Sequence, residues 1–318
     1  MYVREVEPYD AILIVSFGGP EKREDVIPFL ENVTRGRGVP RERLEGVAHH
    51  YYHFDGRSPI NDQVRALIDA LRLPLPVYWG NRNWHPLIPD TLKRMTDDGI
   101  RRVLALATSA FGSYSGCRQY LENIEQARHA VGNTAPAIDK IGPFWDHPGF
   151  LEAQADRVRD ALAKVGSEAE LLFTAHSIPR AMAVSSPYVS QLEEACRRVA
   201  SMVGARQWRL VYQSRSGPPS VPWLEPDVCD YLRGRAGRDP IIVVPIGFLS
   251  DHIEVLWDLD EEAASVARES GIYMERAGTV GTHPKFVEGL RDLIQEHLKQ
   301  GVRRCGADCC PGQNPTAS

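Results

Sequence analysis

One histidine stands where a parallel sheet would present a base. His176 directly follows the apolar segment LLFTA and precedes the turn-forming Ser177-Ile178-Pro179. A side chain at the end of a strand projects into the crevice where open α/β sheets bind their ligands. Imidazole changes its protonation state near neutral pH, so His176 could accept or relay protons. The alternative is a histidine that is hydrogen-bonded within a tight turn.

Three acidic residues form a second candidate site. In the segment IIVVPIGFLSDHIEVLWDLDEEA, a helix is predicted to begin near Asp251, after a strand and a Gly-containing turn. Glu254, Asp258 and Glu262 are spaced i, i+4, i+8, which on an α-helix places them in one stripe. The stripe could be a solvated face favoured by the helix dipole. It could also bind or convey a divalent cation, with His252 as a nitrogen ligand or an orienting partner.

Aromatic and basic residues in other predicted loops suit a large, flat ligand that carries carboxylates. They lie in GNRNWHP (80–86), in WRLVYQSRSGPPSVPWLEPD with Gln213, Ser214, Arg215 and Trp223, and in two early loops with Arg35, Arg37, Arg57 and Ser58. Trp223 could instead fill a domain interface, and the loop arginines could simply be solvated. Gly18-Gly19 follow the first strand, but neither G-x-G-x-x-G nor a P-loop lysine is present, so a nucleotide cofactor is not supported.

The elements that position these residues alternate in the manner of an α/β protein. Short runs rich in Ile, Val and Leu are separated by amphipathic stretches, which predicts β-α units that build a parallel sheet. Predicted strands are 11–17, 76–79, 103–108, 170–175, 209–213 and 241–246, and predicted helices include 60–71, 117–130 and 150–165.

Two similar open-sheet domains are the simplest account of the chain, because ILIVSFGGP and LLFTAHSIP are both strand-then-turn segments closed by proline. We expect an N-terminal domain over 1–148, a second domain over 149–282, and a C-terminal helix over 283–300 that joins the first domain. The tail 301–318, with its cysteines, is too polar to be core, and its ordering would need a metal.

Composition limits the class of protein. The 318 residues allow about two domains. Hydrophobic residues at 43% and charged residues at 25% are ordinary globular values. A formal net charge of -5 gives no basic field for a nucleic acid. The sequence has neither a signal peptide nor an apolar run of about 20 residues, so a cytoplasmic protein without membrane attachment is expected.

The segments SFGGP, LENVTRGRGVP, SPIN, NRNW, FTAHSIP, QSRSGPPSVPWLEPDV and PIGFLSDHIEVLWDLD occur in this order over about residues 9–299. Together they resemble the ferrochelatases, in particular the actinobacterial type that acts on coproporphyrin. The resemblance implies a lyase of haem biosynthesis that inserts Fe²⁺ into coproporphyrin III to give coproheme. It also implies two Rossmann-like domains of the class II chelatase type, with the porphyrin bound in a cleft between them.

The same resemblance assigns roles to individual residues. His176 would accept pyrrole protons and bind metal, and Glu254 would face it across the macrocycle. Asp258 and Glu262 would continue the acidic stripe and carry incoming metal or outgoing protons. Substrate-binding residues would be Phe17, Arg35, Arg37, Ser58, Tyr120 and Trp223, with the two arginines as first choices for the propionates. Phe17 departs from relatives that have tyrosine at this position, so no phenol is available there.

The terminal Cys305, Cys309 and Cys310 resemble the cysteines with which some ferrochelatases hold a [2Fe–2S] cluster, and Cys117 is the best candidate for the fourth ligand. Cys196 and Cys229 fall in predicted helices, where core packing is the better interpretation.

Alternatives remain open at the level of sequence. A chelatase for another metal or tetrapyrrole would keep His176 and Glu254 unchanged. A porphyrin or haem carrier without turnover would need only the aromatic residues and arginines. We expect a monomer, with a transient contact to the next enzyme of haem synthesis.

Overall fold

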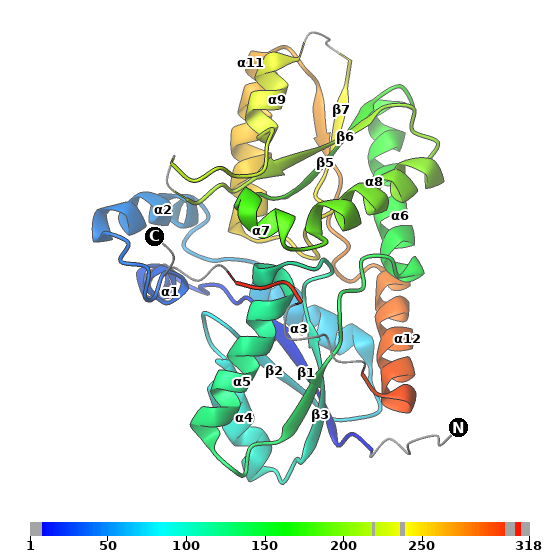
Figure 1. Cartoon of the computed structure of the whole chain (residues 1–318). Coiled ribbons are helices and arrows are strands. Elements are labelled where there is room, and N and C mark those ends of the chain that lie inside the picture. Colours follow the sequence, from blue (N-terminus) through cyan, green and yellow to red (C-terminus); the bar gives the residue numbers. More distant parts are fainter. Residues whose placement is uncertain (1–7, 218–219, 236–238, 303–308, 313–318) are drawn as a thin grey trace. The chain divides into compact units, whose positions relative to one another are not determined.

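The computed structural model describes residues 8–217, 220–235, 239–302 and 309–312. Their contacts divide them into two compact units. The described residues of Met1–Ser109, Gln119–Gly142 and Leu290–Gly306 form unit 1, and those of Ala110–Arg118, Pro143–Gly289 and Ala307–Ser318 form unit 2. The domain limits expected from the sequence stay predictions. Figure 1 shows the helices and strands of both units.

Unit 1 is built on a four-stranded parallel sheet. Its strands are β1 (Ala11–Ser16), β2 (Val77–Asn81), β3 (Arg102–Ala107) and β4 (Ala137–Lys140), in the order β2-β1-β3-β4. Every residue of β1 is buried, as a central strand covered on both faces requires. The last pair in the register of β1 and β2 joins Ser16 to Asn81.

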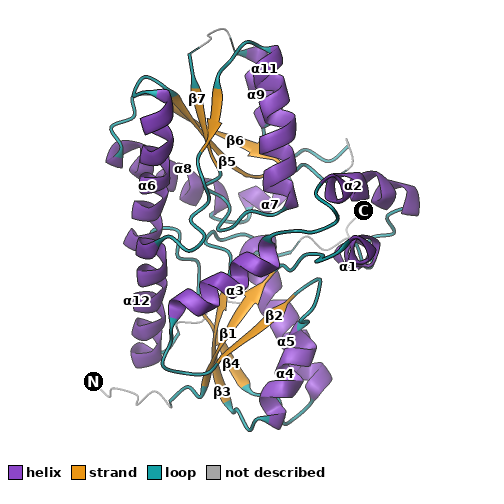
Figure 2. Ribbon diagram, turned by 180° about the vertical axis from the view of Figure 1, so that it is seen from behind, coloured by secondary structure: helices purple, strands orange, loops and turns teal. Residues whose placement is uncertain are grey.

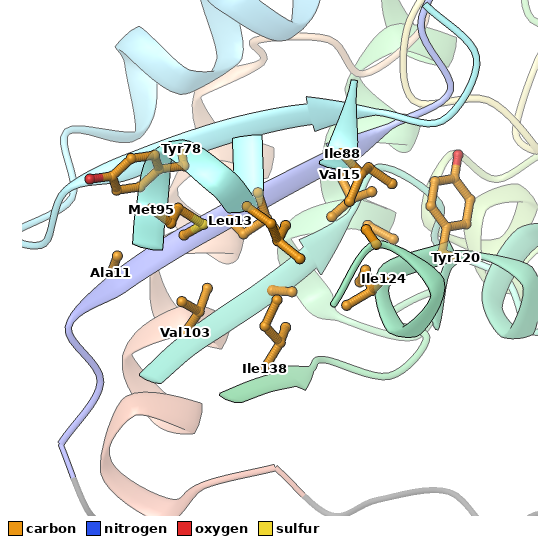
Figure 3. Close-up of a cluster of buried hydrophobic side chains, with 14 residues drawn as sticks. Ala11, Leu13, Val15, Tyr78, Ile88, Met95, Val103, Tyr120, Ile124 and Ile138 are labelled. Atoms are coloured by element: carbon orange, nitrogen blue, oxygen red, sulfur yellow. The ribbon is translucent and has the colours of Figure 1, made fainter. Parts of the chain in front are cut away.

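Helices cover both faces of this sheet (Figure 2). Leu13 and Val15 of β1 pack with Leu92 of α4 (Ile88–Asp97) and Ile124 of α5 (Gln119–Val131) in one buried cluster (Figure 3). The opposite face carries α3 (Ile60–Leu71) and α12 (Pro284–Gln300), where the Arg291 guanidinium donates to the Leu71 carbonyl at 2.7 Å. Successive side chains of β1 point to opposite faces of the sheet, so they pack against two separate layers of helices.

A smaller core lies beside the carboxyl end of β1. The short 3₁₀ turn η1 (Arg23–Asp25) leads into α1 (Val26–Val33), which packs with α2 (Arg41–His53) around buried Phe29 and Leu44. Half-buried Phe17 and Trp84 pack against this core. The Phe17 and Phe29 rings meet edge to face, with centroids 6.3 Å apart.

Unit 2 repeats the sheet of unit 1. Its strands are β5 (Glu170–His176), β6 (Trp208–Gln213), β7 (Ile241–Val244) and β8 (Met274–Arg276), again all parallel and in the equivalent order β6-β5-β7-β8. The last pair in the register of β5 and β6 joins His176 to Gln213. The resemblance between the two strand-then-turn segments in the sequence therefore reflects one topology used twice.

The helices of unit 2 also form two layers (Figure 1). On one face lie α6 (Pro148–Val165) and α8 (Tyr188–Met202), and the short α7 (Arg180–Val184) follows β5. On the other face lie α9 (Val228–Gly234) and a continuous helical segment that runs through α10 (Ile253–Val255), the π-helix η3 (Leu256–Ala263) and α11 (Ala264–Glu269). A second π-helical turn, η2 (Tyr114–Arg118), precedes α5.

The predicted α/β class with parallel sheets is confirmed. The helix predicted over 60–71 has those limits in the structure, and the predicted strands agree with the observed ones to within two residues. The sequence analysis missed β4 and β8, which are only four and three residues long. Among the described helices, none combines the length and the apolar composition that crossing a lipid bilayer requires.

Candidate functional site

His176 is the last residue of β5, and its backbone and ring are both held by hydrogen bonds. The Tyr188 hydroxyl donates to the His176 carbonyl at 3.0 Å. The His176 Nδ1 lies 2.5 Å from the Ser177 carbonyl oxygen, which can only accept, so Nδ1 carries the proton. The Nε2 lone pair is then available for a proton or a metal ion, and 33% of the side chain is exposed.

The turn after His176 is clamped by the segment that carries Trp223. Pro179 forms a β-bridge with Trp223, and the Ser177 hydroxyl donates to the Leu224 carbonyl at 2.9 Å. The Trp223 ring is buried and lies against the backbone of Gly217, where a Cβ atom would approach the ring to 2.3 Å. These contacts give Trp223 a packing role, and a contact with substrate stays a prediction.

Glu254 approaches His176 from the neighbouring loop and helix. The strand β5 lies between β6 and β7, so residues that follow β7 meet the end of β5 at the point where the strand order reverses. His176 Nε2 lies 3.8 Å from Glu254 Oε2, and His252 Nδ1 lies 4.0 Å from the same oxygen. Burial lowers the pKa of His252, and the charge of His176 acts in the same direction against the attraction of Glu254.

That Glu254 faces His176 across a macrocycle stays a prediction. A flat ring in van der Waals contact with both side chains would hold them about 7 Å apart, twice the usual carbon–carbon contact distance. The imidazole and the carboxylate lie 3.8 Å apart, so a ring between them would require the two side chains to separate.

Asp258 occupies the π-helix and is held from β6. The Ser214 hydroxyl donates to Asp258 Oδ2 in a short hydrogen bond, and Gln213 Nε2 reaches the same oxygen at 3.4 Å and the Glu254 carbonyl at 3.1 Å. Ser214 adopts a left-handed backbone conformation with φ 62°, which is rare for a residue with a side chain. Burial raises the pKa of Asp258 to about 7. The charges of Glu254 and Glu262 add to this effect, and the Ser214 hydrogen bond opposes it.

Glu262 continues the acidic series to the first turn of α9. Its charge contributes to raising the pKa of Asp258 and also that of Asp227, although burial is the larger cause in both cases. The Asp227 carboxylate caps α9 by accepting from the backbone N–H of Cys229 at 2.8 Å. The sequence analysis missed Asp227, because a lone aspartate before a helix reads only as a helix cap.

One expectation about this acidic series is corrected. The i, i+4 argument assumed an α-helix, whereas Leu256–Ala263 is a π-helix with i→i+5 hydrogen bonding. Within the described residues, no three His, Cys, Asp or Glu side chains converge as a metal-binding group. That His176, Glu254, Asp258 and Glu262 bind or convey metal stays a prediction.

In unit 1, Arg82 links two of the residues expected to bind substrate. Its guanidinium carbon lies 5.7 Å from the centre of the Phe17 ring and 4.7 Å from that of Tyr120. Arg82 Nε also donates to Asn123 Oδ1 at 2.8 Å. Tyr120 is 4% exposed, and its hydroxyl points away from Ile124 (Figure 3). The sequence analysis noted the segment that contains Arg82 but did not single this residue out.

The remaining early-loop residues differ in exposure. Arg35 is exposed and donates to Asn32 Oδ1 in a short hydrogen bond, and Arg37 is also exposed. Ser58 is 4% exposed and lies against Gly19, where a Cβ atom would come within 2.8 Å of the Ser58 Cβ. Arg57 is paired with Asp62 at 2.5 Å.

Three of the cysteines expected to hold a cluster, Cys117, Cys309 and Cys310, are described, and all three belong to unit 2. Among the described residues they do not converge as a metal-binding group. The Sγ atoms of Cys309 and Cys310 are 4.0 Å apart. Gly312 lies against the ring of Tyr114, at the start of the π-helical turn that contains buried Cys117. Cys305 lies outside the described residues. Cys196 and Cys229 are core residues, and burial raises the pKa of both thiols, that of Cys229 to about 12.

Comparison with known proteins decides the family. A sequence model of the family Ferrochelatase matches residues 9–298. A ferrochelatase of Rhodopirellula baltica is 52% identical, over 98% of this chain and 97% of its own length. The chain belongs to the ferrochelatase family. Other relatives include the coproporphyrin III ferrochelatases of Streptomyces coelicolor, 48% identical over 98% of this chain and 96% of theirs, and of Mycolicibacterium smegmatis, 53% identical over 91% and 90%.

Solved structures show the same fold beyond this family. The sirohydrochlorin chelatase SirB from Bacillus subtilis subspecies spizizenii superposes with a TM-score of 0.55 at 13% identity, over 91% of this ferrochelatase-family chain and 94% of its own. CbiX of denitrifying bacteria gives a TM-score of 0.52 at 16% identity, over 90% and 98%. The predicted class II chelatase-like fold is thereby confirmed.

Proposed function

We propose that this protein inserts Fe²⁺ into coproporphyrin III and releases two protons. The observation that carries the proposal is the His176–Glu254 pair, in which an imidazole Nε2 with a free lone pair lies 3.8 Å from a carboxylate at the end of β5. Metallation replaces two pyrrole N–H protons by one metal ion, so it needs a base beside the metal route. Family membership and the names of the similar proteins support the substrate.

His176 accepts the first pyrrole proton at Nε2 in this proposal. Glu254 stabilises the resulting imidazolium, since Oε2 lies beside both His176 and His252. Asp258 receives protons or conveys metal onward, and its pKa of about 7 suits exchange near neutral pH. Glu262 extends this route. Arg35 and Arg37 are proposed to bind propionates by bidentate hydrogen bonds, together with Ser58. Phe17, Tyr120 and Trp223 are proposed to contact the macrocycle.

We further propose that Cys117, Cys305, Cys309 and Cys310 hold a [2Fe–2S] cluster. Thiolates are the usual ligands of such clusters, and the 4.0 Å separation of Cys309 and Cys310 suits two ligands of one cluster. The packing of Gly312 on Tyr114 supports Cys117 as a further ligand. When bound, the cluster supplies a one-electron centre, which metal insertion does not require.

The test is anaerobic Fe²⁺ insertion followed by absorbance, with coproporphyrin III and protoporphyrin IX offered separately. Wild-type protein is expected to metallate coproporphyrin III in preference. His176→Ala is expected to bind the porphyrin and to lose turnover by roughly 10²-fold or more. The matched control is His129→Ala, because His129 is exposed on α5. Tight binding without turnover by wild-type protein would instead identify a porphyrin carrier.

A further inference from the structure

Besides its contacts with β6, the π-helix of unit 2 is bound by Arg276, a half-buried arginine. A π-helix is a rare conformation, and its wider turn needs outside contacts to persist. Arg276 is the last residue of β8. Its guanidinium binds one residue just before this helical segment, Asp251, and one within the π-helix, Asp260. Its side chain is 16% exposed. The sequence analysis did not single out Arg276, because it lies in no motif.

The contacts of Arg276 have the geometry of a brace. Nε and Nη2 bind the two carboxylate oxygens of Asp260 at 2.5 and 2.9 Å, a bidentate pair. Nη1 binds Asp251 Oδ1 at 3.1 Å, and the Thr279 hydroxyl reaches the same oxygen at 3.3 Å. Asp251 precedes α10, and Asp260 lies within the π-helix. The Arg276 guanidinium therefore joins Asp251 and Asp260, which flank Glu254 and Asp258 in the sequence.

This arrangement fixes the helical register of the acidic series. If the turn relaxed to the i→i+4 bonding of an α-helix, residues after the relaxed turn would rotate relative to those before it. Asp258 and Glu262 would then lose their alignment with Glu254, while the porphyrin-facing residues elsewhere would not move. The hydrogen bonds of the Arg276 side chain go to Asp251 and Asp260 and not to Glu254, Asp258 or Glu262, so its effect on these three is indirect.

We propose that Arg276 is a positioning residue for metal insertion, which acts through Asp251 and Asp260 to keep the π-helix in register. The inference rests on the proposed function of the His176–Glu254 site. Arg276 lies on the edge strand of the sheet, outside the site itself. Its contacts with Asp251 and Asp260 affect the rate of metal insertion and leave the affinity for porphyrin unchanged.

The experiment measures anaerobic Fe²⁺ insertion and, separately, porphyrin binding from the shift of the porphyrin absorption band. Arg276→Gln and Asp260→Asn are each expected to lower kcat about 10- to 100-fold, with KM and affinity for coproporphyrin III within about twofold of wild type. Arg276→Lys keeps the charge but loses the bidentate fork, so it is expected to restore only part of kcat. The control is Glu275→Gln on the same strand, which removes an ion pair with exposed Lys164.

The double variant Arg276→Gln/Asp260→Asn separates a brace from two independent effects. Residues that act as one unit are not additive, so its kcat should equal that of Arg276→Gln alone. A product of the two losses, a kcat unchanged in folded Arg276→Gln, or an equal loss of porphyrin affinity would overturn the proposal. If Arg276→Gln does not fold, Asp260→Asn carries the test, because that carboxylate is 35% exposed. Lack of insertion by wild-type protein would count against the proposed function instead.

Discussion

At the scale of single residues, hydrogen bonds to His176 decide which atom of its ring remains available to a ligand. The Ser177 carbonyl fixes the tautomer of His176, and the Tyr188 hydroxyl holds the backbone of the same residue. The imidazole therefore presents Nε2 in a fixed direction. Preorganisation of this kind lowers the cost of reaching the reactive geometry when substrate arrives.

Asp258 makes stability and rate depend on pH in a predictable direction. Its pKa of about 7 in the folded protein lies above its ordinary value of 3.8, because burial and two neighbouring carboxylates disfavour the charge. Folding therefore favours the neutral form. The resulting stabilisation is fully present below about pH 4 and is lost as the pH rises through about 7.

The variant Asp258→Asn removes this titration. Its melting temperature relative to wild type is expected to rise between pH 5 and pH 8, because only the wild-type carboxyl must ionise in a buried place. The insertion rate of wild-type protein is expected to rise through pH 7, and the variant should lack that limb. Asp230→Asn, which alters an exposed ion pair with Arg233, serves as the control. Parallel melting curves for wild type and Asp258→Asn at both pH values would contradict the assignment.

At the scale of elements, α6 and the first residues of α12, which belong to unit 2, approach each other closely through glycines. A Cβ atom on Gly289 of α12 would lie 2.9 Å from His147 Nδ1 and 3.0 Å from Gly149 Cα, and one on Gly149 of α6 would lie 2.6 Å from the Lys285 carbonyl oxygen. The close approach of these two backbones thus requires glycine at both positions, 149 and 289.

Gly289→Ala is expected to destabilise the protein by about 1–3 kcal/mol, because the added methyl group forces the two helices apart. The same substitution at Gly46, which is exposed within α2 and has no atom within 4 Å of the new Cβ, should stabilise it by about 0.5–1 kcal/mol. Urea denaturation of both variants measures the two effects. Equal shifts in the same direction would show that helix propensity outweighs packing at both sites.

The elements also show how far sequence reasoning reaches. The apolar spacing of Ile60, Val64, Leu67 and Leu71 fixed both ends of α3, since these side chains face one buried side. The strands β4 and β8 are too short to carry a periodic signal. The π-helix could not be predicted, because a change from i→i+4 to i→i+5 hydrogen bonding leaves no pattern in side-chain types.

Some residues of the candidate site could also be predicted from the sequence, and others could not. His176 and Glu254 were predicted from strand ends and spacing, and the structure brings them together. The proximity of His252 to Glu254 was suggested by their positions in one turn. Arg276 and Arg82 were not predicted, because each acts across elements that are distant in the sequence, and a lone arginine has no motif to mark it.

At the scale of the whole molecule, a residue near the C-terminus lies against a turn from the first half of the chain. Within unit 2, Gly312 lies against the ring of Tyr114, in the π-helical turn that contains Cys117, and Cys309 and Cys310 precede Gly312 by two to three residues. A cluster held by these thiolates would link residues far apart in the chain and would stabilise the fold that holds it.

Cys117→Ala and Cys310→Ala are each expected to lose the visible absorption and the acid-labile sulfide of anaerobically purified full-length protein. Their melting temperatures should fall toward that of cluster-free protein, while iron insertion into coproporphyrin III continues. Cys196→Ala is the control, because that thiol lies buried in α8 away from this set. A Cys117→Ala protein that retains its sulfide would require a different fourth ligand.

The two sheets have the same strand order but carry different residues at equivalent positions. The last paired positions of the first two strands are Ser16 and Asn81 in unit 1, and His176 and Gln213 in unit 2. Both pairs include a carboxamide side chain, Asn81 or Gln213, but only the second includes an imidazole. One topology thus supplies the same carboxyl-end position twice, and the side chain placed there decides whether that position can accept a proton.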